Sequence, residues 1–218
     1  MKTIVLLSGG LDSTVLLTYC LSLHHEVKAI GFDYGQRHRR ELESALAVAR
    51  SLGVEFTVAD LSALKPVLAG SSQTSDDIDV PFGHYAEETM KATVVPNRNM
   101  LMLAVAGAWA ISSEFEQVAY AAHAGDHPIY PDCRPGFVDA LSSAMQLAHW
   151  HGVNIFAPFI NRTKAEIVRL GNQLAAPLDL TWSCYVGGEK HCKRCGTCVE
   201  RVEAFQLAGV IDPTVYEQ

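Results

Sequence analysis

The residues best suited to chemistry stand near the start of the chain, in the run Ser8-Gly9-Gly10-Leu11-Asp12-Ser13-Thr14. This run follows a short apolar stretch, residues 3–7, which predicts a buried strand, and it leads into a predicted helix. Glycine permits turn conformations that are closed to other residues, so successive backbone N–H groups can converge there. Converging N–H groups at a helix N-terminus bind anions, above all phosphate. The run therefore predicts a phosphate-binding loop.

The loop lacks the lysine that follows the second glycine in the Walker A motif of many ATP-binding proteins. The order Ser, Gly, Gly, any residue, Asp, Ser instead resembles the PP-loop of the ATP pyrophosphatase superfamily. That resemblance implies cleavage of ATP between its α- and β-phosphates and activation of a substrate oxygen as its adenylate, with ATP held by residues 8–14. The alternative is an ordinary strand–turn–helix in which Asp12 or Ser13 caps the helix.

Four cysteines cluster near the C-terminus with the spacing Cys184-x7-Cys192-x2-Cys195-x2-Cys198. The two overlapping Cys-x-x-Cys pairs match tetrahedral zinc–thiolate geometry, and a full set of thiolates leaves no place for water. We therefore predict a structural zinc that clips the C-terminal segment onto the rest of the chain. The alternatives are unrelated thiols or a redox Cys-x-x-Cys pair. His191 is a competing ligand, but it adjoins Cys192 and both could not bind without strain.

A second candidate anion site lies in the run Asn161-Arg162-Thr163-Lys164-Ala165-Glu166. Thr163 and Glu166 have the spacing of a capping box, and Gly171 is the predicted end of the helix that they begin. Lys164 then stands in the first turn, where the helix dipole disfavours a cation unless an anion is bound there. Lys164 is therefore predicted to bind phosphate; the alternative is an exposed lysine.

Further polar residues lie in the proline-rich segment 123–135. Arg134 could grip a carboxylate with two hydrogen bonds, and Asp126 or Asp132 could accept from the N–H and amino edge of a guanine-like base. Prolines hold the backbone, which favours a preorganised pocket over an ordinary solvated loop. The runs Tyr34-Gly35-Gln36-Arg37-His38 and Pro96-Asn97-Arg98-Asn99 are expected to face the same pocket.

The candidate site residues must be positioned by strands and helices, and the pattern of these elements in the sequence predicts an α/β fold. Residues 27–33 and 55–59 are predicted strands, and between them residues 40–52 carry a helical apolar stripe that ends at Gly53. This alternation predicts a doubly wound parallel sheet with ligands beyond the carboxyl ends of its strands. Helices are expected over residues 100–112 and 137–151, a strand over 118–122 and a long loop over 62–95. We divide the chain into a nucleotide-binding domain, residues 1–175, and a zinc-binding segment, residues 176–218, packed on it.

Composition narrows the class of protein. The chain has 218 residues, 49% of them hydrophobic, which suffices for one substantial α/β domain. The net charge of −7 argues against direct nucleic-acid binding. No targeting pattern is evident, and the longest apolar run, residues 100–111, is too short to cross a membrane. A cytoplasmic protein is therefore expected, and six cysteines in such a protein favour metal binding or chemistry over disulfides.

Taken together, these motifs resemble the 7-cyano-7-deazaguanine synthase family of queuosine biosynthesis. The likeness runs from the loop at Ser8 to the cysteines ending at Cys198, nearly the whole chain, and implies an adenine nucleotide alpha hydrolase-like fold of the PP-loop type. One departure is Lys193-Arg194 between two cysteines, where relatives often carry Gly first.

The resemblance implies that ATP, ammonia and 7-carboxy-7-deazaguanine react to give the nitrile, AMP and pyrophosphate, through an adenylated carboxylate and then an adenylated amide. Asp12 is expected to contact Mg²⁺, Lys164 to stabilise pyrophosphate, and His38 to accept a proton. The expected substrate-binding residues are Gln36, Arg98, Asp126, Asp132 and Arg134. A homodimer with small-molecule partners only is expected. The competing interpretations are a tRNA-thiolating PP-loop enzyme, an NAD- or GMP-synthetase-like amidating enzyme and a zinc-knuckle binding protein.

Overall fold

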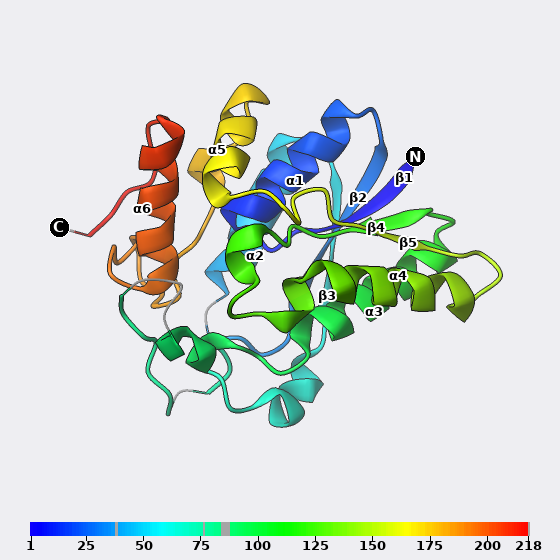
Figure 1. Ribbon diagram of the computed structural model, residues 1–218, viewed down its shortest axis with the longest axis horizontal. Coiled ribbons are helices and arrows are strands. Elements are labelled where there is room, and N and C mark those ends of the chain that lie inside the picture. Colours follow the sequence, from blue (N-terminus) through cyan, green and yellow to red (C-terminus); the bar gives the residue numbers. More distant parts are fainter. Residues whose placement is uncertain (38, 76, 84–87, 218) are drawn as a thin grey trace.

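A five-stranded parallel sheet organises the chain, with the strand order β3-β2-β1-β4-β5 (Figure 1). The computed structural model describes residues 1–37, 39–75, 77–83 and 88–217. The strands are β1 (Lys2–Leu6), β2 (Glu26–Asp33), β3 (Glu55–Asp60), β4 (Gln117–Ala119) and β5 (Asn154–Phe156). Strand β1 is central and pairs with β2 on one side and β4 on the other, both parallel. The turn that follows β1 therefore opens at the middle of the sheet's carboxyl edge.

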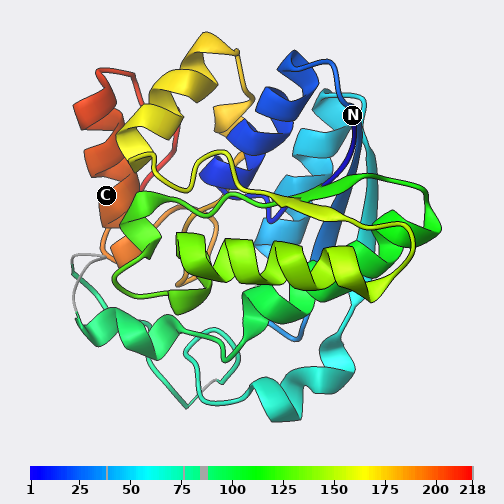
Figure 2. The same cartoon turned by 45° about the vertical axis from the view of Figure 1, so that its right-hand side comes forward.

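Helices cover both faces of this sheet (Figures 1 and 2). They are α1 (Leu11–Ser22), α2 (Arg40–Ser51), α3 (Arg98–Ser112), α4 (Pro135–Ala148), α5 (Lys164–Gln173) and α6 (Gly196–Ala208). Ile4 belongs to an apolar cluster with α3 and α4, whereas its neighbour Val5 belongs to a cluster with α1, α2, α5 and α6. Adjacent strand residues point to opposite faces, so the sheet separates the two cores. The predicted doubly wound α/β fold is confirmed.

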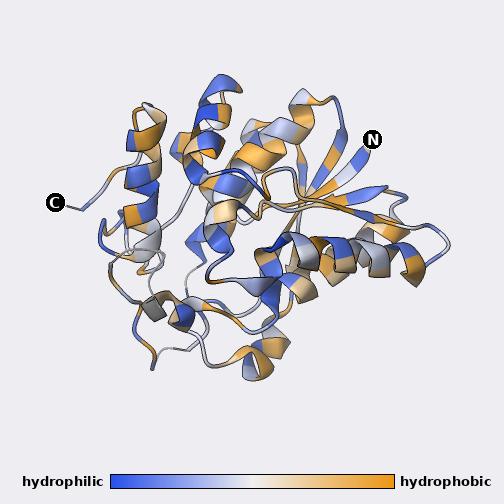
Figure 3. Ribbon diagram, in the orientation of Figure 1, coloured by the Kyte–Doolittle hydropathy of each residue, from blue (hydrophilic) through white to orange (hydrophobic). Residues whose placement is uncertain are grey.

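Hydrophobic residues concentrate along the strands and on the helix faces that meet them (Figure 3). The described parts of the segment 62–95 contain only short 3₁₀ turns, at Ser62–Leu68 and Glu88–Thr93, in agreement with the predicted loop. Short 3₁₀ turns also occur at Ala124–Asp126, Pro131–Cys133 and Leu178–Leu180. In the part of the chain that the structure describes, no helix has the length and apolar character needed to span a bilayer.

Several boundaries differ from the prediction. Strand β5 was not expected; it is three residues long, and two of its three residues are only partly buried, so its pattern is too weak to detect. Helix α3 begins at Arg98 rather than at residue 100, with Asn97 as its N-cap. Gly171 lies within α5, not at its end. A Cβ at Gly171 would stand 2.7 Å from Val15, so this glycine lets α5 pack against α1.

The C-terminal residues share the core of the nucleotide-binding part. Leu178, Ala204 and Phe205 are buried in the same apolar cluster as Val5. The side chain of Arg201 is fully buried and donates to Asp212 Oδ1 at 3.2 Å and to Thr181 Oγ1 at 2.8 Å. It also donates to Ser183 Oγ and to the carbonyl oxygen of Leu178, both at 3.2 Å. The division of the chain at residue 175 stays a prediction.

Candidate active site

The predicted phosphate-binding loop connects β1 to α1 and has the geometry of an anion site. Gly9 adopts φ +85°, and a Cβ on it would stand 2.1 Å from the carbonyl oxygen of Glu41, so only glycine lets α2 pack this closely on the loop. The hydroxyls of Ser8 and Ser13 lie 3.0 Å apart and brace the turn. Gly10 is the N-cap of α1, and no side chain caps that helix. The alternative role of Asp12 or Ser13 as a cap is therefore wrong, and the helix N-terminus is open to a ligand.

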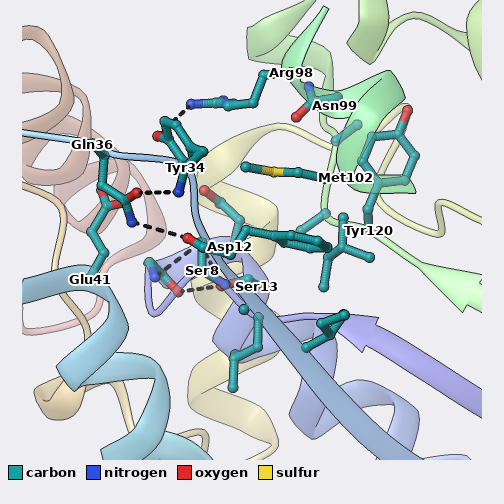
Figure 4. Close-up of a pocket in the computed structure, with 18 of the residues that line it drawn as sticks. Ser8, Asp12, Ser13, Tyr34, Gln36, Glu41, Arg98, Asn99, Met102 and Tyr120 are labelled. Carbon is teal, nitrogen blue, oxygen red and sulfur yellow. Dashed lines mark hydrogen bonds between the residues drawn. The ribbon is translucent and has the colours of Figure 1, made fainter. Parts of the chain in front are cut away.

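A cavity of about 240 Å³ opens beside this loop at the carboxyl ends of β1, β2 and β4 (Figure 4). At one end it is lined by loop residues, and at the other by polar and aromatic side chains from later in the chain. The predicted site residues that line it are Ser8, Gly10, Asp12, Ser13, Gln36, Arg98 and Asp126. The fold thus brings predicted residues from four separate segments to one place.

The other predicted site residues lie away from the cavity lining. Leu11 and Thr14 are buried beneath the loop. Asp132 Oδ2 accepts from the backbone N–H of Asn99 at 3.3 Å, in the first turn of α3. Arg134 is exposed, and its Nε donates to the carbonyl oxygen of His127 at 2.8 Å. His38, the predicted proton acceptor, lies outside the described residues.

Lys164 is joined to the loop by a cluster of charges. Its Nζ lies 3.0 Å from Asp12 Oδ2 and 2.7 Å from Glu200 Oε2, and its side chain is only 15% exposed. The capping box predicted from Thr163 and Glu166 is present and holds the first turn of α5, from which Lys164 extends. The exposed-lysine alternative is therefore wrong. Two carboxylates surround this cation, one from the loop and one from α6.

The electrostatics of the cluster keep Asp12 and Lys164 ionised. Burial alone would raise the pKa of Asp12, but the nearby Lys164 ammonium and His123 hold it below its usual value. Burial would lower the pKa of Lys164, but Asp12 and Glu200 outweigh it and raise that pKa. His123 Nδ1 accepts from the backbone N–H of Gly125, which leaves Nε2 facing Asp126 at 3.6 Å and Asp12 at 3.9 Å. Lys164 is therefore a fixed cation beside the loop.

One oxygen of Asp12 has no hydrogen-bond partner among the described residues. Asp12 Oδ1 is buried and makes no hydrogen bond to any residue that the structure describes, whereas Oδ2 contacts Lys164. A buried carboxylate oxygen without a donor is costly, so its retention beside a phosphate-binding loop points to a ligand that supplies positive charge.

The far end of the cavity is aromatic and contains the predicted Arg98 together with Glu41, an acid that sequence reasoning missed. Arg98 Nη1 lies 3.5 Å from the hydroxyl of Tyr34, and Tyr130 and Tyr185 also line this end. Glu41 lines it from α2, and burial raises the pKa of its carboxyl to about 7 although Arg98 opposes the shift. An acid in the first turn of a predicted helix usually interacts with the helix dipole in solvent, so its type and spacing did not single Glu41 out.

Gln36 shapes the turn after β2. Its Oε1 accepts from the backbone N–H of Tyr34 at 2.9 Å, and its Nε2 donates to the carbonyl oxygen of Phe32 at 3.1 Å. Both ends of the amide are therefore engaged with the backbone, although the side chain lines the cavity (Figure 4). In this structure Gln36 holds Tyr34 in place.

The four cysteines form a buried metal-binding cluster. The Sγ atoms of Cys184, Cys192, Cys195 and Cys198 all lie within 4.8 Å of one another. The backbone N–H groups of Arg194 and Cys195 donate to Cys192 Sγ at 3.4 and 3.3 Å, as expected where thiolates ligate a metal. His191 is not a fifth ligand, because its Nε2 accepts from the backbone N–H of Ser183 at 3.0 Å.

The turn between Cys192 and Cys195 depends on Lys193. This residue adopts φ +62°, the left-handed region that favours glycine. Lys193, the departure noted in the sequence, therefore occupies a backbone conformation that glycine adopts without strain. Gly196, which follows Cys195, is the first residue of α6.

Known proteins share this fold. A U34-tRNA thiolase from Methanococcus maripaludis superposes with a TM-score of 0.53 at 18% identity, over 81% of this chain and 58% of its own. An NMN synthetase from Francisella tularensis superposes with a TM-score of 0.53 at 16% identity, over 96% of this chain and 77% of its own. At such low identity the likeness establishes the α/β fold and no more.

Sequence relatives are much closer. A 7-cyano-7-deazaguanine synthase from Brucella anthropi is 55% identical over all of this chain and 94% of its own length. One from Rhizobium rhizogenes is 54% identical over all of this chain and 92% of its own length. The model of the queuosine biosynthesis protein QueC matches residues 2–209. The chain belongs to the QueC family of queuosine biosynthesis proteins.

Proposed function

We propose that this chain is an ATP-dependent synthase that converts 7-carboxy-7-deazaguanine and ammonia to 7-cyano-7-deazaguanine, releasing AMP and pyrophosphate. Membership of the QueC family supports the reaction. The structural observation that carries it is the open phosphate-binding loop, with Lys164 and Asp12 3.0 Å apart, at one end of a cavity whose other end is aromatic and charged. Such a cavity offers one end suited to phosphate and another suited to a planar acceptor.

The loop and the charges beside it are suited to stabilise the negative charge that develops during adenylation. A carboxylate is a poor electrophile until its oxygen carries AMP, and that transfer develops negative charge on the departing pyrophosphate. Lys164 and the free N–H groups of the loop stabilise that charge. The unpartnered Oδ1 of Asp12 fits a contact with Mg²⁺ bound to ATP, direct or through water.

The acceptor is proposed to bind at the aromatic end. Arg98 supplies a fixed cation for its carboxylate, and Asp126 supplies a hydrogen-bond acceptor for the base. Gln36, Asp132 and Arg134 would act indirectly, since their side chains engage the backbone of the turns around the cavity. Tyr34 and Tyr185 offer faces on which a planar base can stack.

The cysteine cluster fits a structural zinc. Zn–S bonds of about 2.3 Å in a tetrahedron separate sulfur atoms by about 3.8 Å. The observed Sγ atoms, all within 4.8 Å of one another, are compatible with that spacing. Cys184, Cys192, Cys195 and Cys198 would hold the ion, which supplies stability and no reaction step. We also propose a cytoplasmic homodimer that binds small molecules and no nucleic acid.

Mass spectrometry of a single reaction tests the function. Purified zinc-loaded protein is incubated with ATP, Mg²⁺, ammonium and 7-carboxy-7-deazaguanine. Formation of the nitrile together with AMP and pyrophosphate is the expected result. AMP and pyrophosphate without the nitrile would move the acceptor elsewhere, and no ATP turnover by folded protein would favour a binding role.

A further inference from the structure

The proposed reaction releases protons from nitrogen in both of its halves. In the first half ammonia forms a C–N bond to the adenylated carboxylate and AMP leaves with the C–O bond electrons. The new nitrogen must then lose a proton to give the amide. In the second half the adenylated amide loses its N–H protons as the C≡N bond forms and AMP leaves again. A base within reach of the nitrogen would serve both halves.

The charged groups beside the loop are already engaged. Lys164 is a cation held by Asp12 and Glu200, so it cannot accept a proton. Asp12 is held ionised, with its pKa below the usual range, and is a weak base. Asp126 accepts from the backbone N–H of His123 at 3.3 Å and forms the capping box of that turn. These groups can bind and orient phosphate and metal, but they are poorly suited to receive a nitrogen proton.

Glu41 differs from these groups in its surroundings. It extends from the first turn of α2 into the cavity, on the side of Tyr34 and Arg98 (Figure 4). Tyr185, which also lines the cavity, is close enough for the charge of Glu41 to act on it. Its carboxylate makes no hydrogen bond or ion pair of its own with the residues that the structure describes, although the charge of Arg98 acts on it. Its backbone oxygen packs against Gly9, so this carboxylate starts beside the loop on which the adenylate would form.

We propose that Glu41 is the base that receives the nitrogen protons in amide and nitrile formation. The inference rests on the proposed function and deepens it, and it puts this role on Glu41 in place of His38. A carboxyl whose pKa is about 7 matches the operating pH of such a base, because it can accept a proton from nitrogen and release it to solvent in each turnover. Among the residues that the structure describes, the titratable groups whose electrostatics are coupled to Glu41 are Tyr34, Tyr185 and Arg98.

The test separates adenylation from nitrogen chemistry. Glu41→Gln keeps the shape of the side chain and removes the base. Two rates are measured: exchange of labelled pyrophosphate into ATP with 7-carboxy-7-deazaguanine and no ammonia, and formation of amide and nitrile with ammonia. Because adenylation needs no nitrogen base, exchange is expected to stay within about threefold of the wild-type rate. Amide and nitrile formation are expected to fall about 10²–10⁴-fold.

The matched control is Glu43→Gln, which changes an exposed acid on the same helix that does not line the cavity. It is expected to leave both rates unchanged. The acidic limb of the wild-type pH–rate profile, near pH 7, is expected to disappear in Glu41→Gln and to persist in Glu43→Gln. Glu41→Asp should retain part of the nitrile-forming rate.

Two results would overturn the proposal. Nitrile formation by Glu41→Gln at the wild-type rate would exclude a proton-accepting role. An equal loss of exchange and of nitrile formation, with a raised KM for the acid in protein of normal metal content and melting temperature, would make Glu41 an acceptor-binding residue instead. Failure of the wild-type protein to make nitrile at all would instead reject the proposed function, on which the inference rests.

Discussion

Lys164 and Arg201 are two cations withdrawn from solvent, and they stand in opposite situations. Arg201 has no exposed surface, and its guanidinium donates to two side-chain hydroxyls, a carboxylate and a carbonyl oxygen. Lys164 keeps 15% of its side chain exposed and shares two carboxylates, one of which, Asp12, has an oxygen without a partner.

The difference separates a structural charge from a functional one. A buried charge that only stabilises the fold needs all its hydrogen bonds satisfied by the protein, because an unsatisfied group is costly. A charge that serves a ligand needs a surrounding that is left incomplete until the ligand binds. Arg201 satisfies the first condition and the Lys164–Asp12 pair the second. The following predictions test this contrast, from the largest expected effect to the smallest.

Loss of the metal is expected to have the largest effect, because the cysteine cluster holds the segment that contains Arg201. Cys195→Ser, or treatment with a strong chelator, should unfold this segment and abolish activity, since structural zinc contributes about 10 kcal/mol or more in small zinc domains. Thermal unfolding and metal content are the measurements. Cys20→Ala, which removes a thiol far from the cluster, is the control and should keep the metal. An unchanged transition in metal-free protein would contradict the structural role.

Arg201→Met is expected to destabilise the protein by about 3–5 kcal/mol, because Asp212 and the hydroxyl of Thr181 lose their buried partner. Denaturant unfolding measures the change. Arg169→Met removes an exposed arginine that donates to the carbonyl oxygen of Leu207, and should cost less than about 1 kcal/mol. Equal losses of unfolding free energy in the two variants would contradict the claim that the fully hydrogen-bonded, buried Arg201 stabilises the fold more than an exposed arginine does.

Lys164→Met is expected to act on activity instead of folding. Removing a cation that stabilises developing charge typically lowers kcat about 10²–10³-fold. The unfolding free energy should change by less than in Arg201→Met, because Asp12 and Glu200 can take up protons once the ammonium is gone. Steady-state kinetics and unfolding are measured on the same preparation. A stability loss as large as that of Arg201→Met would show that Lys164 is a second structural charge.

Glu41 adds a third case, a buried charge without a full partner. Its pKa is about 7 in the folded protein against 4.5 as the ordinary value, so the folded state binds more protons between these pH values. Stability is therefore expected to fall as pH rises from 4.5 to 7 through this group. Glu41→Gln should remove that slope. Its unfolding free energy, relative to that of the wild type, should therefore rise by about 1–3 kcal/mol between pH 4.5 and pH 7. Parallel pH–stability curves for the two proteins would contradict this.

The smallest effect concerns backbone strain alone. Lys193→Gly should stabilise the folded protein by up to about 1 kcal/mol, because a side chain at φ +62° is strained and glycine is not. The melting temperature of the metal-loaded protein measures the change, with Lys190→Gly, on the same exposed segment but without a positive φ, as the control. A loss of stability in Lys193→Gly would mean that the lysine makes a favourable contact stronger than the strain.

The sequence by itself determined the local features of this protein. The phosphate-binding loop, the capping box of Thr163 and Glu166 and the spacing of the cysteines each depend on residues a few positions apart, and the geometry of such short segments follows from backbone conformation and ligand chemistry. The alternation of strands and helices likewise predicted the parallel sheet, because burial on both faces leaves an apolar pattern along each strand.

Only the tertiary structure decided which charges meet. Glu200 reaches Lys164 across 36 positions and Asp12 reaches it across 152, contacts that no local pattern encodes. Glu41 becomes a cavity residue because Gly9 lets α2 pack on the loop. Asp132 and Arg134 instead form hydrogen bonds with backbone N–H and C=O groups of nearby turns. Burial and pairing are properties of the packed chain, so the protonation and reach of these side chains follow from its three-dimensional arrangement.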